Sequence, residues 1–428
     1  MIAAVLFISL FVFLILGVPV GFSLGISALC GIIAGGTQSI GYLSQTMVAG
    51  CDSFPILAVP LFILAGEMMG GGGVSRRILD VFKASFGRFY GGLAICTVAF
   101  CMFFAAVSGS GPATVAAVGA MVVPTMLAEG YDKSFTLALI ACAGGIGVII
   151  PPSIPMVFYG TSTGASIGNL FMAGMLPGIL IGLCLIGYCY YEGRKHGWRN
   201  TDTEFSWKKL GKAVWDGKWA LLDPFIILGG IYSGIFTPTE AAAVACVYGL
   251  FCGAVIYREL NFKKLIEVLK GAVSTTGTTM LIVGAATAFA KILSITGTPT
   301  AVANAISAVS NSKILILMLI NILLLIVGCF MDTTPAMLIL APILMPIATA
   351  LGVDIIHFGI IMVVNLAIGF ITPPLGINLF VSARVGDEPL GVVIKGIIPF
   401  IIIMLIDLIL ITYVPAISMT LVHMITGR

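Results

Sequence analysis

The residues best suited to bind a ligand lie at four interruptions of long apolar segments, at 108–112, 149–153, 331–335 and 371–375. Each interruption frees backbone carbonyl groups at the end of one half-helix and backbone amide groups at the start of the next. Freed carbonyls together with hydroxyl side chains suit a small hard cation such as Na+, whereas freed amides at a helix N-terminus suit a carboxylate. The sequence therefore predicts a site for a cation and an organic anion inside a membrane.

Hydroxyls, freed carbonyls and one carboxylate are the predicted ligands of the cation. The predicted Na+-binding residues are Ser108, Gly109, Ser110, Gly145, Pro151, Asp332, Thr333, Thr334, Gly369 and Thr372. The predicted substrate-binding residues are Gly111, Pro112, Thr114, Pro152, Ser153, Pro335, Asn365, Pro373 and Pro374. The alternative is that glycine and proline only kink packed membrane helices, which explains one break better than four placed symmetrically.

Asp332 is the only acidic residue at any of the four breaks. A carboxylate inside a membrane is costly enough to indicate a functional site, so we expect it to bind the cation; capping of the following helix is the alternative. Asn365 either adds a side-chain carbonyl to the site or only packs between helices. Glu67 and Lys291 occupy matching places in the two halves, and we expect each to have its own interfacial or subunit-facing role.

The breaks belong to an internal repeat. GVIIPPS at 147–153 and GFITPPL at 369–375 are offset by 222 residues, and the same offset pairs Gly130 with Gly352 and Asp132 with Asp354. Helix breaks at corresponding points of two membrane-embedded halves are the best sequence indication of a transport site.

Composition supports a membrane protein. The chain is 59% hydrophobic and 9% charged, whereas soluble domains have roughly 25% charged residues. Apolar runs of about 20 residues are long enough to cross a bilayer as helices, and backbone groups there must be satisfied internally. The net charge of +3 does not indicate nucleic-acid binding, and the ten cysteines show no CxxC spacing, so we interpret them as packing residues.

We therefore expect an all-α polytopic membrane protein built from two inverted-topology repeats, with two re-entrant hairpins and two broken helices. The first repeat is 1–191, with a hairpin at 90–128 and a broken helix at 134–168; a cytoplasmic linker covers 192–218; the second repeat is 219–428, with a hairpin at 312–350 and a broken helix at 359–383.

Basic residues set the expected orientation. An odd number of membrane crossings in each half places most of the basic residues on one face of the membrane. This face holds 18 of the 21 Lys and Arg residues, in the loops 74–90, 192–218 and 258–276 and at Lys133, Arg384 and Lys395. Only Lys291, Lys313 and Arg428 are elsewhere. The positive-inside rule makes this face cytoplasmic and places both termini on the opposite side.

Five stretches together resemble the large membrane subunit of TRAP (tripartite ATP-independent periplasmic) transporters, over essentially the whole chain. They are SGSGPAT at 108–114, GVIIPPS at 147–153, GIFTPTEAAAVACVYGL at 234–250, MDTTPAM at 331–337 and GFITPPLGINLF at 369–380. The resemblance implies scaffold helices, an amphipathic arm helix, a re-entrant hairpin and an unwound helix in each repeat, and elevator-type transport driven by a Na+ gradient. Many large subunits have an SGSSVA-like first tip, so Gly111 and Pro112 are a modest departure.

The resemblance also implies partners and a location. We expect a small four-helix membrane subunit, a periplasmic substrate-binding protein, and the bacterial inner membrane with both termini in the periplasm. Na+ is the expected coupling ion, with no organic cofactor and no enzymatic activity. The implied substrates are organic acids such as C4-dicarboxylates, sugar acids and sialic acids, among which overall resemblance favours sialic acid.

Two other functions are compatible with parts of this pattern. One is a self-sufficient Na+/dicarboxylate-type elevator carrier with the same fold and no partner proteins. The other is an intramembrane serine hydrolase that uses Ser108 or Ser110. The positions of His196, His357 and His423, in the linker, an external loop and the C-terminal tail, offer no general base near these serines.

Overall fold

The computed structural model describes residues 2–36, 38–199, 206–298, 301 and 312–427. The resemblance implies an arm helix in each repeat; we expect the second one near 296–312, a segment that lies mostly outside the described residues. All regular secondary structure in the described ranges is helical, as predicted for an all-α membrane protein. Eight of these helices are long and apolar enough to cross a membrane.

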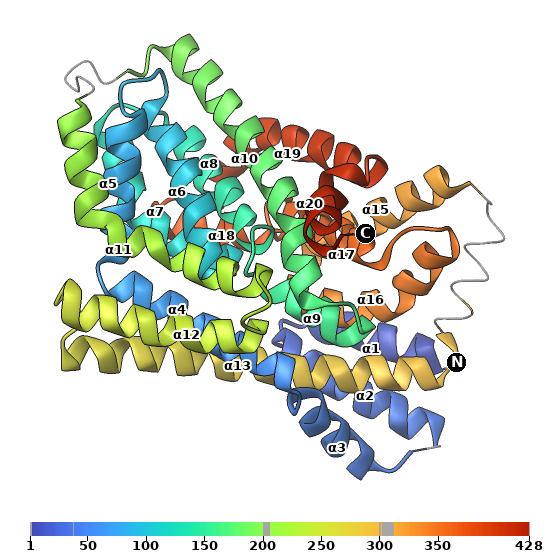
Figure 1. The fold of residues 1–428 in the computed structure, drawn as a ribbon. Coiled ribbons are helices and arrows are strands. Elements are labelled where there is room, and N and C mark those ends of the chain that lie inside the picture. Colours follow the sequence, from blue (N-terminus) through green and yellow to red (C-terminus); the bar gives the residue numbers. More distant parts are fainter. Residues whose placement is uncertain (1, 37, 200–205, 299–300, 302–311, 428) are drawn as a thin grey trace.

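Six helices form a layer along one side of the molecule, which we call the support layer. In Figure 1 they run together across the bottom of the view, with α13 packed against α2, α3 and α4. The support layer consists of α1 (Ile2–Ile15), α2 (Val20–Gly35), α3 (Ile40–Cys51), α4 (Ala58–Gly71), α12 (Pro238–Phe251) and α13 (Phe262–Ile295).

The remaining helices of both repeats form a second body, which we call the site layer because it contains all four predicted breaks. Its first half comprises α6 (Gly92–Ser108), α7 (Gly111–Ala128), α8 (Lys133–Gly145), the short helix η2 (Ile146–Val148), α9 (Ile154–Thr163) and α10 (Ile167–His196). Its second half comprises α15 (Lys313–Phe330), α16 (Thr333–Ala350), α17 (Ile355–Gly369), α18 (Ile377–Val385), α19 (Leu390–Tyr413) and α20 (Ala416–Thr426).

Two helices connect the layers at the left of Figure 1. The amphipathic helix α5 (Val74–Phe86) follows α4 directly and packs against α6, and the long helix α11 (Trp207–Tyr232) packs against both α5 and α12. The guanidinium of Arg77 on α5 lies 2.7 Å from a carboxylate oxygen of Glu259 and 3.8 Å from the centre of the Tyr257 ring. The start of α5 is thus attached to the loop that joins α12 to α13.

Matching residues of the repeat have matching local roles. Gly130 and Gly352 have φ angles of +81° and +71°, a conformation that favours glycine and ends the preceding helix. Asp132 then accepts a hydrogen bond from the Phe135 amide at 2.8 Å, and Asp354 accepts one from the Ile356 amide at 2.7 Å. The two aspartates are therefore N-caps of α8 and α17.

The predicted linker, 192–218, is partly helical in the structure. Helix α10 continues to His196, and α11 begins at Trp207, so both ends of the 192–218 segment are helical. Glu192 stabilises the last turn of α10 through contacts with Lys195 at 3.3 Å and His196 at 3.1 Å. Polar composition predicts where a chain leaves the apolar region, but it does not end a helix.

Polar contacts join the two halves of the site layer. Lys133 Nζ lies 2.5 Å from Glu388 Oε1, the Ser382 hydroxyl donates to the Leu137 carbonyl at 2.6 Å, and the Asn378 amide donates to the Ala141 carbonyl at 3.0 Å. Ser382 and Asn378 are both fully buried. Helix α18 of the second half is thereby fixed against α8 of the first.

Candidate functional site

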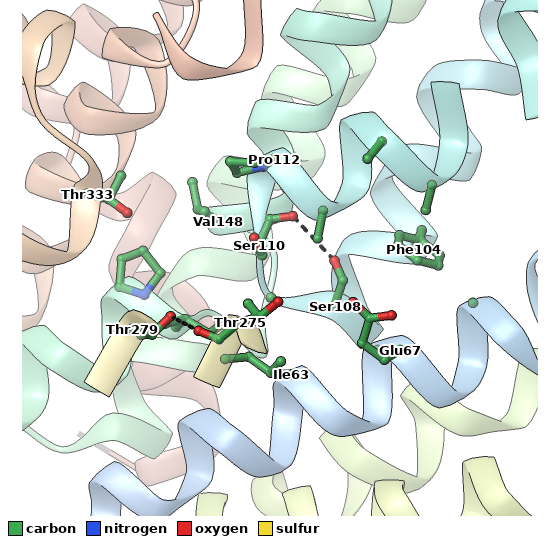
Figure 2. A pocket seen from close by; sticks show the side chains of 18 of the residues that line it. Ile63, Glu67, Phe104, Ser108, Ser110, Pro112, Val148, Thr275, Thr279 and Thr333 are labelled. Carbon is green, nitrogen blue, oxygen red and sulfur yellow. Dashed lines mark hydrogen bonds between the residues drawn. The ribbon is translucent and has the colours of Figure 1, made fainter. Parts of the chain in front are cut away.

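A cavity of about 770 Å³ lies between the support layer and the site layer (Figure 2). This volume is within the range of roughly 300–1,000 Å³ that is typical of small-molecule sites. One wall is formed by α4 and α13, and the opposite wall by the α6–α7 tip, by η2 and α9, and by the start of α16. The break between α15 and α16 therefore meets the break between α6 and α7 at one cavity.

The first tip is organised by hydroxyl groups. The oxygens of Ser108 and Thr114 lie 2.9 Å apart, and the Thr114 hydroxyl donates to the Ser110 carbonyl at 2.8 Å. Helix α6 ends here because Gly109 adopts a φ of +60° and Pro112 occupies the first turn of α7, where proline is favoured.

The first tip packs directly on the unwound segment of its own repeat. The Ile154 amide donates to the Gly109 carbonyl at 3.3 Å. A Cβ at Gly147 would lie 2.7 Å from the Thr114 hydroxyl and 2.8 Å from the Ser110 carbonyl, so only glycine permits this approach. The structure thus brings together the two breaks of the first repeat.

Asp332 both caps a helix and faces the cavity. Its carboxylate accepts hydrogen bonds from the Thr333 amide at 2.6 Å and from the Thr333 hydroxyl at 3.3 Å, which makes it the N-cap of α16. Asp332, Thr333 and Thr334 all line the cavity. The two expectations for Asp332 are compatible, because a capping carboxylate retains free lone pairs.

The predicted site residues separate into two groups. Those that line the cavity are Ser108, Gly109, Ser110, Pro112, Asp332, Thr333 and Thr334. The following do not line it: Gly111, Thr114, Gly145, Pro151, Pro152, Ser153, Pro335, Asn365, Gly369, Thr372, Pro373 and Pro374.

Several residues of the second group have structural contacts instead. The Ser153 hydroxyl donates to the Val148 carbonyl at 2.5 Å and accepts from the Met156 amide at 3.4 Å, so it caps α9. The Thr372 hydroxyl donates to the Ile368 carbonyl at 2.7 Å. A Cβ at Gly369 would lie 2.4 Å from the backbone of Gly328, so this glycine allows α15 and α17 to pack closely.

Asn365 lies in a buried polar bridge between helices. Its amide donates to the Asn321 side-chain oxygen at 2.9 Å and to the Ile361 carbonyl at 2.8 Å, and the Asn321 amide donates to the Thr412 hydroxyl at 3.1 Å. These contacts link α17 to α15 and α19. The Asn365 amide nitrogen thus has a packing role, whereas its side-chain oxygen has no hydrogen-bond partner among the described residues, and a role of this oxygen in the site stays a prediction.

The support layer contributes residues that the sequence did not indicate as part of a site. Glu67 on α4 and Thr275 and Thr279 on α13 line the cavity, and Figure 2 shows Glu67 near Ser108. Glu67 therefore faces the cavity, a placement that the expected interfacial or subunit-facing role did not include. A glycine-rich face of α4, at Gly66 and Gly70, was the only signal that this side of the helix meets another element closely.

The charges of the cavity are of one sign. Among the described lining residues, Glu67 and Asp332 are the only ionisable ones, and none is Lys, Arg or His. Helix N-termini and hydroxyls provide the hydrogen-bond donors. A serine hydrolase is disfavoured, because the Ser108 hydroxyl contacts Thr114 and Ser110, whereas His196 lies against Glu192 and His357 against Ser418.

Among solved structures, the YdaH transporter of Alcanivorax borkumensis, described as having an unusual topology, is similar with a TM-score of 0.61. The match has 17% identity and covers 91% of this chain and 89% of that one. At this identity the likeness concerns the fold alone, and it agrees with the predicted class of polytopic α-helical transporter.

Comparison with known sequences is more specific. The chain is 49% identical over 415 residues to the isethionate TRAP transporter permease protein DctMQ of Oleidesulfovibrio alaskensis. This match covers 97% of this chain and 65% of that longer relative. The chain is 43% identical over 399 residues to the C4-dicarboxylate TRAP transporter large permease protein DctM of Pseudomonas aeruginosa, with 93% of each chain covered. These relatives are transporter permeases and not enzymes.

A family model described as "Tripartite ATP-independent periplasmic transporter, DctM component" matches residues 7–417. Together with the eight long apolar helices, this match indicates a multi-pass protein of the bacterial inner membrane. The chain belongs to the DctM family, the large permease subunits of TRAP transporters for organic acids.

Proposed function

We propose that this subunit takes up an organic acid by Na+-coupled secondary transport, and that its site layer moves as an elevator against the support layer. The observation that supports this proposal best is the cavity between the layers. Hydroxyls and Asp332 of both hairpin tips face it, and no basic side chain is among its described lining residues.

The absence of basic lining residues favours cation coupling. An organic anion in this cavity meets the carboxylates of Asp332 and Glu67 and lacks a Lys or Arg counter-charge. Like charges that lie a few ångströms apart repel each other. Bound Na+ ions would offset it, and hydroxyls, carbonyls and a carboxylate at the tips are oxygen ligands of the kind that Na+ binds.

The arrangement of contacts supports rigid movement of the site layer. Buried hydrogen bonds from Asn378 and Ser382 join its two halves. At the border with the support layer, Gly66 of α4 meets Ser108 of the first tip through van der Waals contact, since a Cβ on Gly66 would lie 3.2 Å from Ser108 Cα. A smooth contact of this kind permits sliding, and moving an intact site avoids exposing its polar groups to lipid.

A small organic acid is the proposed substrate class. The relatives carry different substrates in their names: isethionate at 49% identity, C4-dicarboxylate at 43% and sialic acid at 37%. The expectation of sialic acid stays a prediction, and the more similar relatives favour a smaller acid. The proposed partners are a small membrane subunit and a periplasmic substrate-binding protein.

Reconstitution tests this proposal. The chain is incorporated into proteoliposomes with the small subunit, binding protein is added outside, and uptake of isethionate, succinate and sialic acid is measured with and without an inward Na+ gradient. We expect uptake of one acid only with the gradient and both partners. Equal uptake with a proton gradient alone would contradict Na+ coupling, and uptake by this chain alone would favour the self-sufficient carrier.

A further inference from the structure

Glu67 is a carboxylate of the support layer that faces the cavity. It lies on α4 with Ile63, Gly66, Gly70 and Gly71, residues at helical spacing that all line the same wall. Gly271 of α13 is a close neighbour of the carboxylate, because a Cβ there would lie in van der Waals contact with Glu67 Oε2, at 3.4 Å. The side chain is solvent-exposed in the structure, so the carboxylate is free to act on the contents of the cavity.

No hydrogen bond or ion pair is formed by the Glu67 side chain within the part of the chain that the structure describes. The adjacent wall carries a second unused polar group: the Ser75 hydroxyl, at the start of α5, lines the cavity, is 3% exposed and has no hydrogen-bond partner. A buried polar group without a partner calls for an explanation, and for Ser75 the contents of the cavity are within reach to supply the missing hydrogen bond.

We propose that the Glu67 carboxylate couples substrate movement to cation binding. This inference rests on the proposed Na+-coupled function. Glu67 belongs to the support layer, whereas Asp332 and the tip hydroxyls belong to the site layer. The Glu67 carboxylate therefore acts as a fixed negative charge that the loaded tips meet when they lie opposite α4.

The charge of the tips decides whether they pass this carboxylate. With an organic anion but without Na+, the tips carry the charges of both the anion and Asp332, and Glu67 repels them. Bound Na+ ions cancel these charges and remove the repulsion. The empty tips carry only the charge of Asp332, so their return is opposed less than movement of the anion alone. Glu67 thus suppresses uncoupled leakage of substrate.

The test uses the complete three-part system in proteoliposomes and compares substrate flux with Na+ and with choline in its place. In the Glu67→Gln variant we expect the ratio of Na+-free flux to Na+-driven flux to rise about tenfold, as removal of one unit charge at short range in a cavity predicts. Glu67→Asp keeps the charge and should keep the low leak. Asp216→Asn removes an exposed carboxylate from α11 that does not line the cavity, and it serves as the matched control.

Moving the charge provides a second, independent measurement. Thr275 lines the cavity on the same wall, so the Glu67→Gln/Thr275→Glu double variant should restore the low leak. Thr275→Lys, with Glu67 intact, should raise Na+-free flux in the same way as Glu67→Gln. If Glu67→Gln does not fold, Thr275→Lys provides the test in its place.

The outcomes separate this inference from the proposed function. Wild-type uptake that does not depend on Na+ overturns both. If wild-type uptake depends on Na+ but Glu67→Gln or Thr275→Lys shows no extra leak, only the role of Glu67 is overturned. Complete loss of Na+-driven uptake in folded Glu67→Gln also overturns it, because a fixed repulsive charge is not required for loaded tips to move.

Discussion

At the scale of single residues, the Asp332 side chain combines a structural role with a proposed role in cation binding. Its carboxylate caps α16 through the Thr333 amide and lines the cavity at the same time. Asparagine caps a helix about as well as aspartate, whereas alanine does not and costs about 1 kcal/mol of stability. A substitution that keeps the cap and removes the charge therefore separates the two roles.

We expect Asp332→Asn to fold normally and to lose most of the Na+ dependence of transport, because an amide oxygen binds a cation less strongly than a carboxylate. Activation of uptake by Na+ is measured in proteoliposomes, with thermal unfolding in detergent as the check on folding. Asp332→Ala should be less stable as well. If Asp332→Asn shows wild-type Na+ activation, its carboxylate is not a ligand of the coupling ion.

Thr114 does not line the cavity, but it holds two groups that do. Its hydroxyl lies 2.9 Å from the Ser108 hydroxyl and donates to the Ser110 carbonyl at 2.8 Å. Thr114→Val keeps the shape and removes both of these hydrogen bonds, each of which typically contributes about 0.5–1.5 kcal/mol.

We therefore expect Thr114→Val to raise the Na+ concentration needed for half-maximal uptake about tenfold, with little change in the maximal rate. Thr114→Ser retains the hydroxyl and is the control. A change in Thr114→Ser as large as that in Thr114→Val would contradict this role of the hydroxyl, because Thr114→Ser retains it.

At the scale of elements, the contact between α4 and the first tip depends on one glycine. A Cβ on Gly66 would lie 3.2 Å from Ser108 Cα, a backbone atom that cannot rotate away, whereas a Cβ on Gly70 would meet nothing within 4 Å. Both glycines are on the cavity wall of the same helix, so they form a matched pair.

We expect Gly66→Val to reduce the rate of uptake about tenfold or more, because its branched side chain wedges the tip away from α4 and overpacking typically costs about 1–3 kcal/mol. Gly70→Ala should leave the rate within about twofold of wild type, since it meets no atom and improves helix propensity. Initial uptake rates at saturating Na+ and substrate give the comparison. Equal rates in the two variants would show that the α4 contact does not limit movement.

The elements also show what sequence patterns can predict. Ser108 and Thr333 lie at the helix ends that glycine, proline and aspartate predicted, because these residues end or begin helices by their own local geometry. The side of α4 that faces the cavity could not be predicted, since apolar residues surround this helix and its rotation is set by packing. The position of Glu67 at the cavity was not predicted for that reason.

The second proline pair illustrates the same limit. The repeat predicted equal roles for 149–153 and 371–375, yet the first segment is buried and lies behind the α6–α7 tip, whereas Pro374 and Leu375 are exposed. The sequence repeat determines the backbone break in each half. The neighbours of each break come from other helices, and these differ between the halves.

At the scale of the whole molecule, orientation follows from charge. The segments with 18 of the 21 Lys and Arg residues are predicted to lie on one face, which includes α5 and the end of α10. Cytoplasmic loops of inner-membrane proteins are enriched in Lys and Arg. The predicted orientation therefore places His196 inside, and both termini in the periplasm, where a substrate-binding protein has access to the outer ends of the helices.

Single cysteines in a background without the ten natural ones test this orientation. Lys195 at the end of α10 and Thr426 at the end of α20 are both exposed, so each accepts a cysteine without disturbing packing. In intact cells with a permeable outer membrane, an impermeant thiol reagent should label Thr426→Cys and should label Lys195→Cys only after lysis. The two labelling results depend on each other, because the opposite orientation would require most of the basic residues to cross the membrane. Labelling of Lys195→Cys but not Thr426→Cys from outside would invert the whole topology, and with it the side from which the substrate enters the cavity.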